Sequence, residues 1–148
     1  MFDRRDGPLS SADAGRVCIV DDDPGIRDSL RFLLEDAEYD VEEVTDGGAL
    51  IALLQADPRP RVVLLDRMMT RLDGIATLRL LEDAPTLRQH LTIFMTAGQE
   101  LLDVDAMRLV ERMTFASVNK PFDLDTLLSV VRRASQRLAE RVPGNGPL

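Results

Sequence analysis

The sequence predicts an α/β fold in which a five-stranded parallel sheet is doubly wound, with helices on both faces. Short apolar runs recur five times along the 148-residue chain, and each is followed by a segment with the features of a helix. The central run, residues 61–66, has no polar alternation, which is typical of a strand buried on both faces. Strand–helix alternation favours parallel strands joined by crossover helices, and we expect the strand order 2-1-3-4-5.

The first strand–helix pair begins at the apolar run of residues 17–20. Asp23 suits the N-cap of the following helix, and Pro24 suits its first position. The apolar residues of this helix recur at helical spacing: Ile26, Leu30, Leu33, Leu34 and Ala37. The next run, residues 41–44, is polar in its middle, as expected for an edge strand.

The second and third helices flank the central strand. Asp46 is the expected cap of the second helix, and Pro58 and Pro60 end it. Residues 61–66 form the third strand, and a loop of residues 67–73 leads into the third helix. The apolar positions of the two helices are Ala49, Leu50, Leu53 and Leu54, then Ile75, Leu78 and Leu81.

Two further strand–helix pairs complete the pattern. Residues 91–95 form the fourth run, and residues 115–118 form a weaker fifth run. Asp123 is the expected cap of the last helix. The apolar positions of the fourth and fifth helices are Leu102, Ala106, Leu109, Val110 and Met113, then Leu124, Leu127, Leu128, Val131 and Leu138. We expect one domain over residues 16–141 between flexible tails, residues 1–15 and 142–148, and no second domain or output module.

The composition limits the classes of function. A formal net charge of -8 argues against a nucleic-acid partner, which requires a basic surface, and against an anionic membrane surface. No apolar run approaches the roughly 20 residues of a membrane span, and the N-terminus lacks the apolar region of a signal peptide. The single cysteine fits a reducing compartment. These features predict a soluble, cytoplasmic domain.

Five polar residues directly follow the predicted strands. Because the carboxyl ends of parallel strands meet at one edge of the sheet, we expect these side chains to converge there. They are Asp21, Asp22, Asp66, Thr96 and Lys120. Three neighbouring carboxylates repel one another, and a hard cation with open positions, Mg²⁺, would relieve the repulsion. Asp66 would then stay ionised and able to attack phosphorus, giving an aspartyl phosphate.

The two remaining groups suit the same chemistry. Lys120 would supply a positive charge for one phosphoryl oxygen, because phosphoryl transfer depends on positioning and charge neutralisation. The hydroxyl of Thr96 would donate a hydrogen bond to another oxygen. That hydrogen bond exists only when the phosphoryl group is present, so Thr96 would act as the sensor of the switch.

Four motifs then reveal a resemblance that covers roughly residues 15 to 140. They are Val20-Asp21-Asp22-Asp23-Pro24, Leu64-Leu65-Asp66-Arg67-Met68-Met69 with Asp73-Gly74, Met95-Thr96-Ala97, and Asn119-Lys120-Pro121-Phe122. With these motifs in order, each after a predicted strand, the chain resembles the CheY-like receiver domain of a two-component response regulator. The resemblance implies the flavodoxin-like fold and a signalling protein that catalyses only its own phosphotransfer and autodephosphorylation.

The resemblance also implies roles for individual residues. Asp66 would accept a phosphoryl group from a histidine kinase or a histidine phosphotransfer protein. Asp21 and Asp22, together with Asp66 and the backbone carbonyl of Met68, would bind Mg²⁺. Thr96 and Lys120 would contact the phosphoryl group, and the surface made by the fourth helix, fifth strand and fifth helix would change to signal to a protein target.

Some positions depart from the family pattern. Ser117 stands where the family usually has the aromatic partner of the threonine, and Phe115, two residues earlier, would share its side of a strand. Thr70 stands where a proline is common. An alternative is therefore a degenerate receiver that acts as a phosphorylation-independent interaction module. His90 is isolated in the sequence and is expected on a surface loop.

A second alternative is a haloacid dehalogenase-type phosphohydrolase that uses Asp21 as its nucleophile. The run Asp21-Asp22-Asp23 contains the Asp-x-Asp that such enzymes place after their first strand. Against this reading, Gly25 stands where the motif requires threonine or valine, and Asp66 would have no role.

Overall fold

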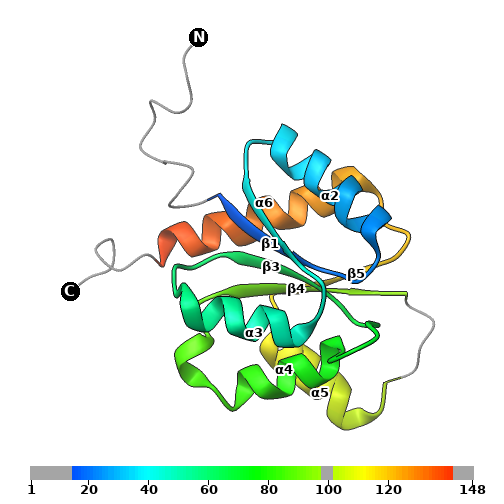
Figure 1. Ribbon diagram of the computed structural model, residues 1–148, viewed down its shortest axis with the longest axis vertical. Coiled ribbons are helices and arrows are strands. Elements are labelled where there is room, and N and C mark those ends of the chain that lie inside the picture. Colours follow the sequence, from blue (N-terminus) through cyan, green and yellow to red (C-terminus); the bar gives the residue numbers. More distant parts are fainter. Residues whose placement is uncertain (1–14, 98–101, 142–148) are drawn as a thin grey trace.

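The computed structural model of the protein describes residues 15–97 and 102–141 (Figure 1). Five parallel strands form one sheet in the order β2-β1-β3-β4-β5, which confirms the predicted fold class. The strands are β1 Arg16–Val20, β2 Asp40–Val44, β3 Val62–Asp66, β4 Leu91–Thr96 and β5 Ala116–Asn119. The helices are α2 Pro24–Asp36, α3 Gly47–Ala56, α4 Gly74–Glu82, the 3₁₀ turn η2 Pro85–Leu87, α5 Val104–Met113 and α6 Leu124–Glu140.

The helices cover both faces of the sheet. α2 and α6 lie on one face, and α3, α4 and α5 lie on the other (Figure 1). Two apolar cores result, because successive side chains of a strand point to opposite faces. In β3, Val62 and Leu64 pack toward the first pair of helices, whereas Val63 and Leu65 pack toward the other three. The uninterrupted apolar run of this central strand is thereby explained.

An aspartate begins each of the α-helices α2 to α6. Its side chain accepts a hydrogen bond from a backbone N–H of the first turn, which satisfies a group that the helix leaves unpaired. The capping residues are Asp23, Asp46, Asp73, Asp103 and Asp123. Each helix therefore starts at a defined position directly after the loop that leaves a strand.

The observed elements differ from the expected ones at a few boundaries. The fifth strand begins at Ala116, not at residue 115, and the fourth helix begins after Asp103, so Leu102 precedes it. The short turn η2 was not expected. The proposed tails fall almost wholly outside the described residues. None of the helices in the described ranges is long and apolar enough to cross a membrane.

Candidate functional site

Three aspartates meet at the carboxyl end of the sheet. Asp21 and Asp22 follow β1, and Asp66 is the last residue of β3, the neighbouring strand. One carboxylate oxygen of each residue lies within 4.8 Å of the others. Asp21 is fully buried and Asp66 is only 5% exposed, whereas Asp22 is partly exposed. The strand order therefore brings together residues that are 45 positions apart in the chain.

Lys120 joins this cluster from the end of β5. Its Nζ donates to Asp21 Oδ2 at 2.8 Å and lies 3.0 Å from Asp66 Oδ1. Burial alone would lower the pKa of Lys120, but its hydrogen bonds to the two carboxylates raise the pKa above its ordinary value. Lys120 is therefore a fixed positive charge between two acids at neutral pH.

Asp66 is held in an environment that disfavours its charge. Burial raises the pKa of its carboxyl above the ordinary value. The hydrogen bonds from Lys120 and from the backbone of Met68 lower the pKa, whereas the negative charge of Asp21 raises it. Three carboxylates face one ammonium group, so the site retains an excess of negative charge. Carboxylate oxygens in this number fit a hard divalent cation.

Backbone groups and one arginine hold the two acids that follow β1. Asp21 Oδ1 accepts from the backbone N–H of Asp23 at 3.0 Å, and the Asp21 carbonyl accepts from Arg27 Nη1 at 2.9 Å. Asp22 Oδ2 accepts from the backbone N–H of Thr70 at 2.9 Å. The two backbone N–H donors could not be identified from the sequence, because a backbone N–H carries no signature of residue type.

Thr96 lies at the same edge of the sheet as the acids. It is the last residue of β4, and its carbonyl accepts from the backbone N–H of Lys120 at 2.7 Å. The backbone thus ties the expected sensor to the lysine. The Lys120–Pro121 peptide bond is cis.

The aromatic partner of the family switch has no counterpart at the expected place. Ser117 is exposed, and its neighbours Ala116 and Val118 pack toward α2 and α6, so Ser117 points to the other face of β5. Phe115 precedes the strand and packs toward α6, with the Arg137 guanidinium 5.6 Å from its ring centre. The expectation that Phe115 shares the side of Ser117 is therefore wrong.

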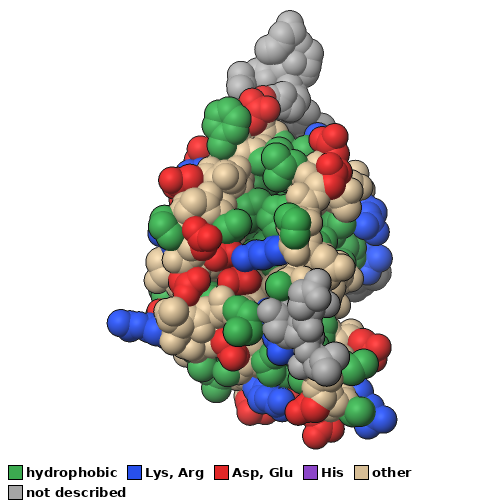
Figure 2. Space-filling model, turned by 90° about the vertical axis from the view of Figure 1, so that its right-hand side faces the viewer, with side chains coloured by type: hydrophobic (Ala, Val, Ile, Leu, Met, Phe, Trp, Pro, Cys, Tyr) green, Lys and Arg blue, Asp and Glu red, His purple; other side chains and the backbone are tan. Residues whose placement is uncertain are grey.

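The site opens onto the face formed by the carboxyl ends of the strands. Figure 2 shows this face, where acidic side chains gather beside a basic one in a shallow hollow. Among the acids of the site, Asp22 is the most accessible. A cation or a phosphoryl group could therefore approach the cluster from solvent.

Residues 17–132 match the family described as the response regulator receiver domain. The chain belongs to this family. It is 35% identical over 136 residues to the response regulator MprA of Mycobacterium sp. (strain KMS), covering 89% of this chain and 54% of MprA. A crystal structure of a CheY-like response regulator receiver domain protein from Methanospirillum hungatei JF-1 has a TM-score of 0.75 and 32% identity. That match covers 84% of this chain and 97% of the other.

The receiver domain is one part of some relatives. This chain spans about half the length of MprA and of RpaA from Synechocystis sp., to which it is 33% identical over 132 residues, covering 86% of this chain and 52% of RpaA. RpaA is named a DNA-binding dual master transcriptional regulator. The match to the receiver family speaks against the haloacid dehalogenase alternative.

Proposed function

We propose that this receiver accepts a phosphoryl group on Asp66 from a phosphohistidine of a histidine kinase or a histidine phosphotransfer protein. The observation that carries the proposal is the position of Lys120 Nζ, 3.0 Å from Asp66 Oδ1 and 2.8 Å from Asp21 Oδ2. A lysine held between two buried acids suits a site at which a further anionic group must be received.

Mg²⁺ fits the donor set of this site. Asp21, Asp22 and Asp66, with the backbone carbonyl of Met68, would hold the ion, and oxygen ligands of this kind are those it prefers. When bound there, it would neutralise charge on the carboxylates and on the phosphoryl oxygens. Asp22 keeps a fixed orientation through Thr70, so one ligand is already positioned.

The transfer itself requires little acid–base chemistry. A carboxylate oxygen of Asp66 forms the bond to phosphorus as the bond from phosphorus to the donor's imidazole nitrogen breaks. Burial raises the pKa of Asp66, so the positive charge of Lys120 is needed to keep the nucleophile ionised. The ammonium group then contacts a phosphoryl oxygen and stabilises the charge that arrives with it.

The signal would leave through the surface of α5, β5 and α6. Thr96 ends β4 beside β5, so its contact with a phosphoryl group would act on this surface. Val104 and Met107 of α5 are 58% and 50% exposed, which offers apolar area to a protein target. The net charge of -8 disfavours contact of this chain with nucleic acid.

Phosphorylation by acetyl phosphate tests the proposal. We expect Mg²⁺-dependent addition of one phosphoryl group to the wild type, measured by intact mass, and none to Asp66→Asn. Asp28→Asn is the matched control, because Asp28 is an exposed aspartate of α2 outside the site. Metal-dependent labelling that persisted in Asp66→Asn would place the acceptor elsewhere.

The degenerate receiver remains the second candidate, and the exposed Ser117 favours it. Serine has no aromatic ring, so the aromatic side chain that usually moves together with the threonine is missing at this position. A wild type that takes no phosphoryl group, yet binds its target equally well with and without acetyl phosphate, would establish this alternative.

A further inference from the structure

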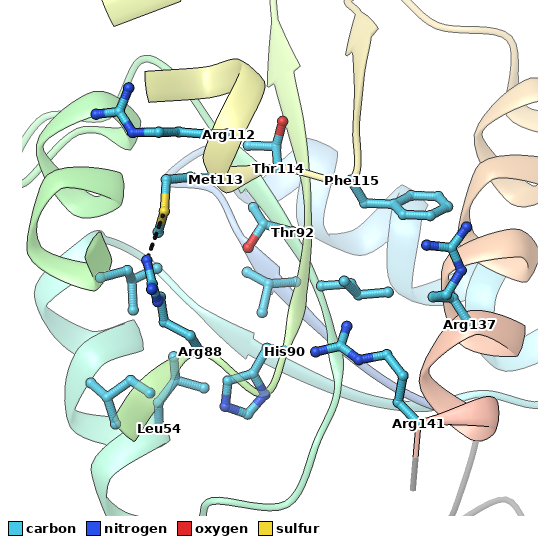
Figure 3. Close-up of a pocket in the computed structure, with 14 residues that line it drawn as sticks. Leu54, Arg88, His90, Thr92, Arg112, Met113, Thr114, Phe115, Arg137 and Arg141 are labelled. Atoms are coloured by element: carbon cyan, nitrogen blue, oxygen red, sulfur yellow. Dashed lines mark hydrogen bonds between the residues drawn. The ribbon is translucent and has the colours of Figure 1, made fainter. Parts of the chain in front are cut away.

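A cavity of about 550 Å³ lies at the amino end of the sheet, opposite the acidic site (Figure 3). It is bounded by the first residues of β4, by Phe115 ahead of β5, and by the last turns of α5 and α6. Leu54, Leu81 and Leu87 contribute apolar walls from α3, α4 and η2. A volume of this size is ordinary for a small-molecule site, which is usually about 300–1,000 Å³.

His90 provides a buried polar group in the wall of this cavity. It is 9% exposed, so the expectation of a surface loop residue is wrong. Its Nδ1 accepts from the backbone N–H of Arg61 at 3.2 Å, so the neutral ring carries its proton on Nε2. Nε2 is buried and has no hydrogen-bond partner among the described residues. Burial, with the charges of Arg61 and Arg16, lowers the pKa of His90 to about 4, which keeps the ring neutral.

Arginines surround the cavity, and its lining contains no carboxylate in the described part of the chain. Arg112 is paired with Glu82, at 2.5 and 3.1 Å. Arg88, Arg137 and Arg141 form no ion pair among the described residues; Arg137 instead lies over Phe115. The cavity therefore has a local excess of positive charge in a chain whose net charge is -8.

We propose that this cavity binds a small organic anion whose carboxylate or phosphate group contacts Arg137 and Arg141 and whose apolar body lies against the leucines. Guanidinium groups form the strongest charge-assisted hydrogen bonds with such head groups. In Figure 3, Arg137 and Arg141 reach the cavity from α6 and Leu54 lies on its other side, so the head group and the apolar body of the ligand would have separate contacts. An acceptor atom on the occupant would also satisfy His90 Nε2.

The test is a titration of the whole, unphosphorylated protein followed by backbone amide chemical shifts. The probes are hexanoate and hexyl phosphate, with hexan-1-ol as the neutral body and acetate as the head group alone. We expect saturable shifts at amides of the cavity with one or both hexyl anions, and binding roughly tenfold weaker for hexan-1-ol and acetate. The two anions distinguish a carboxylate site from a phosphate site.

Substitutions of single arginines at the end of α6 test which side chains contact the head group of the anion. Arg141→Gln and Arg137→Gln should each weaken hexyl-anion binding roughly tenfold, because each removes a charge-assisted contact. Arg133→Gln on the same helix is the control, since Arg133 is exposed and does not line the cavity. Asp66→Asn should bind the anions unchanged, which separates this site from the proposed phosphoacceptor. Hexan-1-ol binding as tightly as the anions, or full affinity in both arginine variants, would overturn the proposal.

Discussion

The ionised form of Asp66 is stabilised by Lys120 and destabilised by burial and by the charge of Asp21. Its carboxyl group is 5% exposed and faces Asp21, while Lys120 supplies the opposing positive charge. The raised pKa means that ionised Asp66 costs the folded protein free energy at neutral pH. A functional site commonly carries such a cost, because the arrangement that receives a ligand is not the one that maximises stability.

Replacing Asp66 by asparagine should therefore stabilise the metal-free protein. The pKa of Asp66 is higher in the folded protein than in the unfolded chain. The contribution of Asp66 to the free energy of unfolding therefore falls as the pH rises from the unfolded-state pKa through the folded-state pKa. At about pH 8, we expect Asp66→Asn to have a higher free energy of unfolding than the wild type. The gain should shrink as the pH falls through the raised pKa, and it should disappear below about pH 3.9, the ordinary pKa of Asp, where the carboxyl is protonated in both states.

The measurement is urea denaturation in EDTA across this pH range. Asp28→Asn, on the exposed side of α2, should leave the free energy of unfolding unchanged. An Asp66→Asn variant that is less stable than the wild type at every pH would contradict the argument that burial and Asp21 dominate at this site.

The residues of the acidic site were predictable because each one ends a strand. Asp21, Asp66 and Lys120 follow apolar runs, and the strand order then fixes which of them become neighbours. The group that orients Asp22, the backbone N–H of Thr70, has no signature in a sequence. His90 looked isolated because its partner, the backbone N–H of Arg61, lies 29 positions away in the chain, directly before β3.

Helix α4 is tied closely to the strand that ends in Asp66. A Cβ added at Gly74 would lie 2.6 Å from the carbonyl oxygen of Asp66, 2.8 Å from Arg67 Cα and 2.9 Å from Phe94 Cε1. Two of these neighbours are backbone atoms that cannot move alone. Only glycine fits at the start of this helix, and the position of the helix in turn fixes the end of β3.

Gly74→Ala should consequently destabilise the fold and disturb Asp66, the proposed acceptor. We expect a loss of about 1–3 kcal/mol in the free energy of unfolding, the usual cost of overpacking, together with slower phosphorylation of Asp66. Gly48→Ala is the matched control in the first turn of α3, because its nearest contact is the Asp46 side chain at 3.3 Å. The measurement is urea denaturation of both variants. Equal free energies of unfolding for Gly74→Ala and Gly48→Ala would contradict this prediction.

Helices and strands were predictable where residues within the element itself determine its position. Aspartate caps mark the starts of the helices, and β3 shows its burial by an uninterrupted apolar run. The start of α5 was misplaced because Leu102 fits the helical spacing although Asp103 is the cap. The turn η2 has no periodicity of its own, since a three-residue element is too short to carry one.

At the scale of the whole molecule, two charged clusters lie at opposite ends of the sheet. Carboxylates gather where the strands end, and arginines surround the cavity where β4 and β5 begin. The acidic end could be anticipated from strand ends alone. The cavity could not, because its wall combines single residues of several helices and strands whose packing no sequence pattern specifies.

Metal binding should add to the stability of the entire fold. The carboxylates of the site come from β1 and β3 and meet only when the sheet is assembled, so the unfolded chain has no such site. Mg²⁺ at 100 times its dissociation constant should then raise the free energy of unfolding by about 2.7 kcal/mol. The measurement is the thermal midpoint of the wild type in EDTA and in rising Mg²⁺.

Asp22→Asn isolates the metal's contribution to this stability, because an amide oxygen can still accept from the backbone N–H of Thr70 while the ligand charge is lost. Its midpoint in EDTA should stay near that of the wild type, and its rise with Mg²⁺ should be mostly lost. Asp28→Asn should respond to Mg²⁺ like the wild type. A rise that is equal in all three proteins would mean that the cation acts through general charge screening of an acidic molecule rather than at the three aspartates.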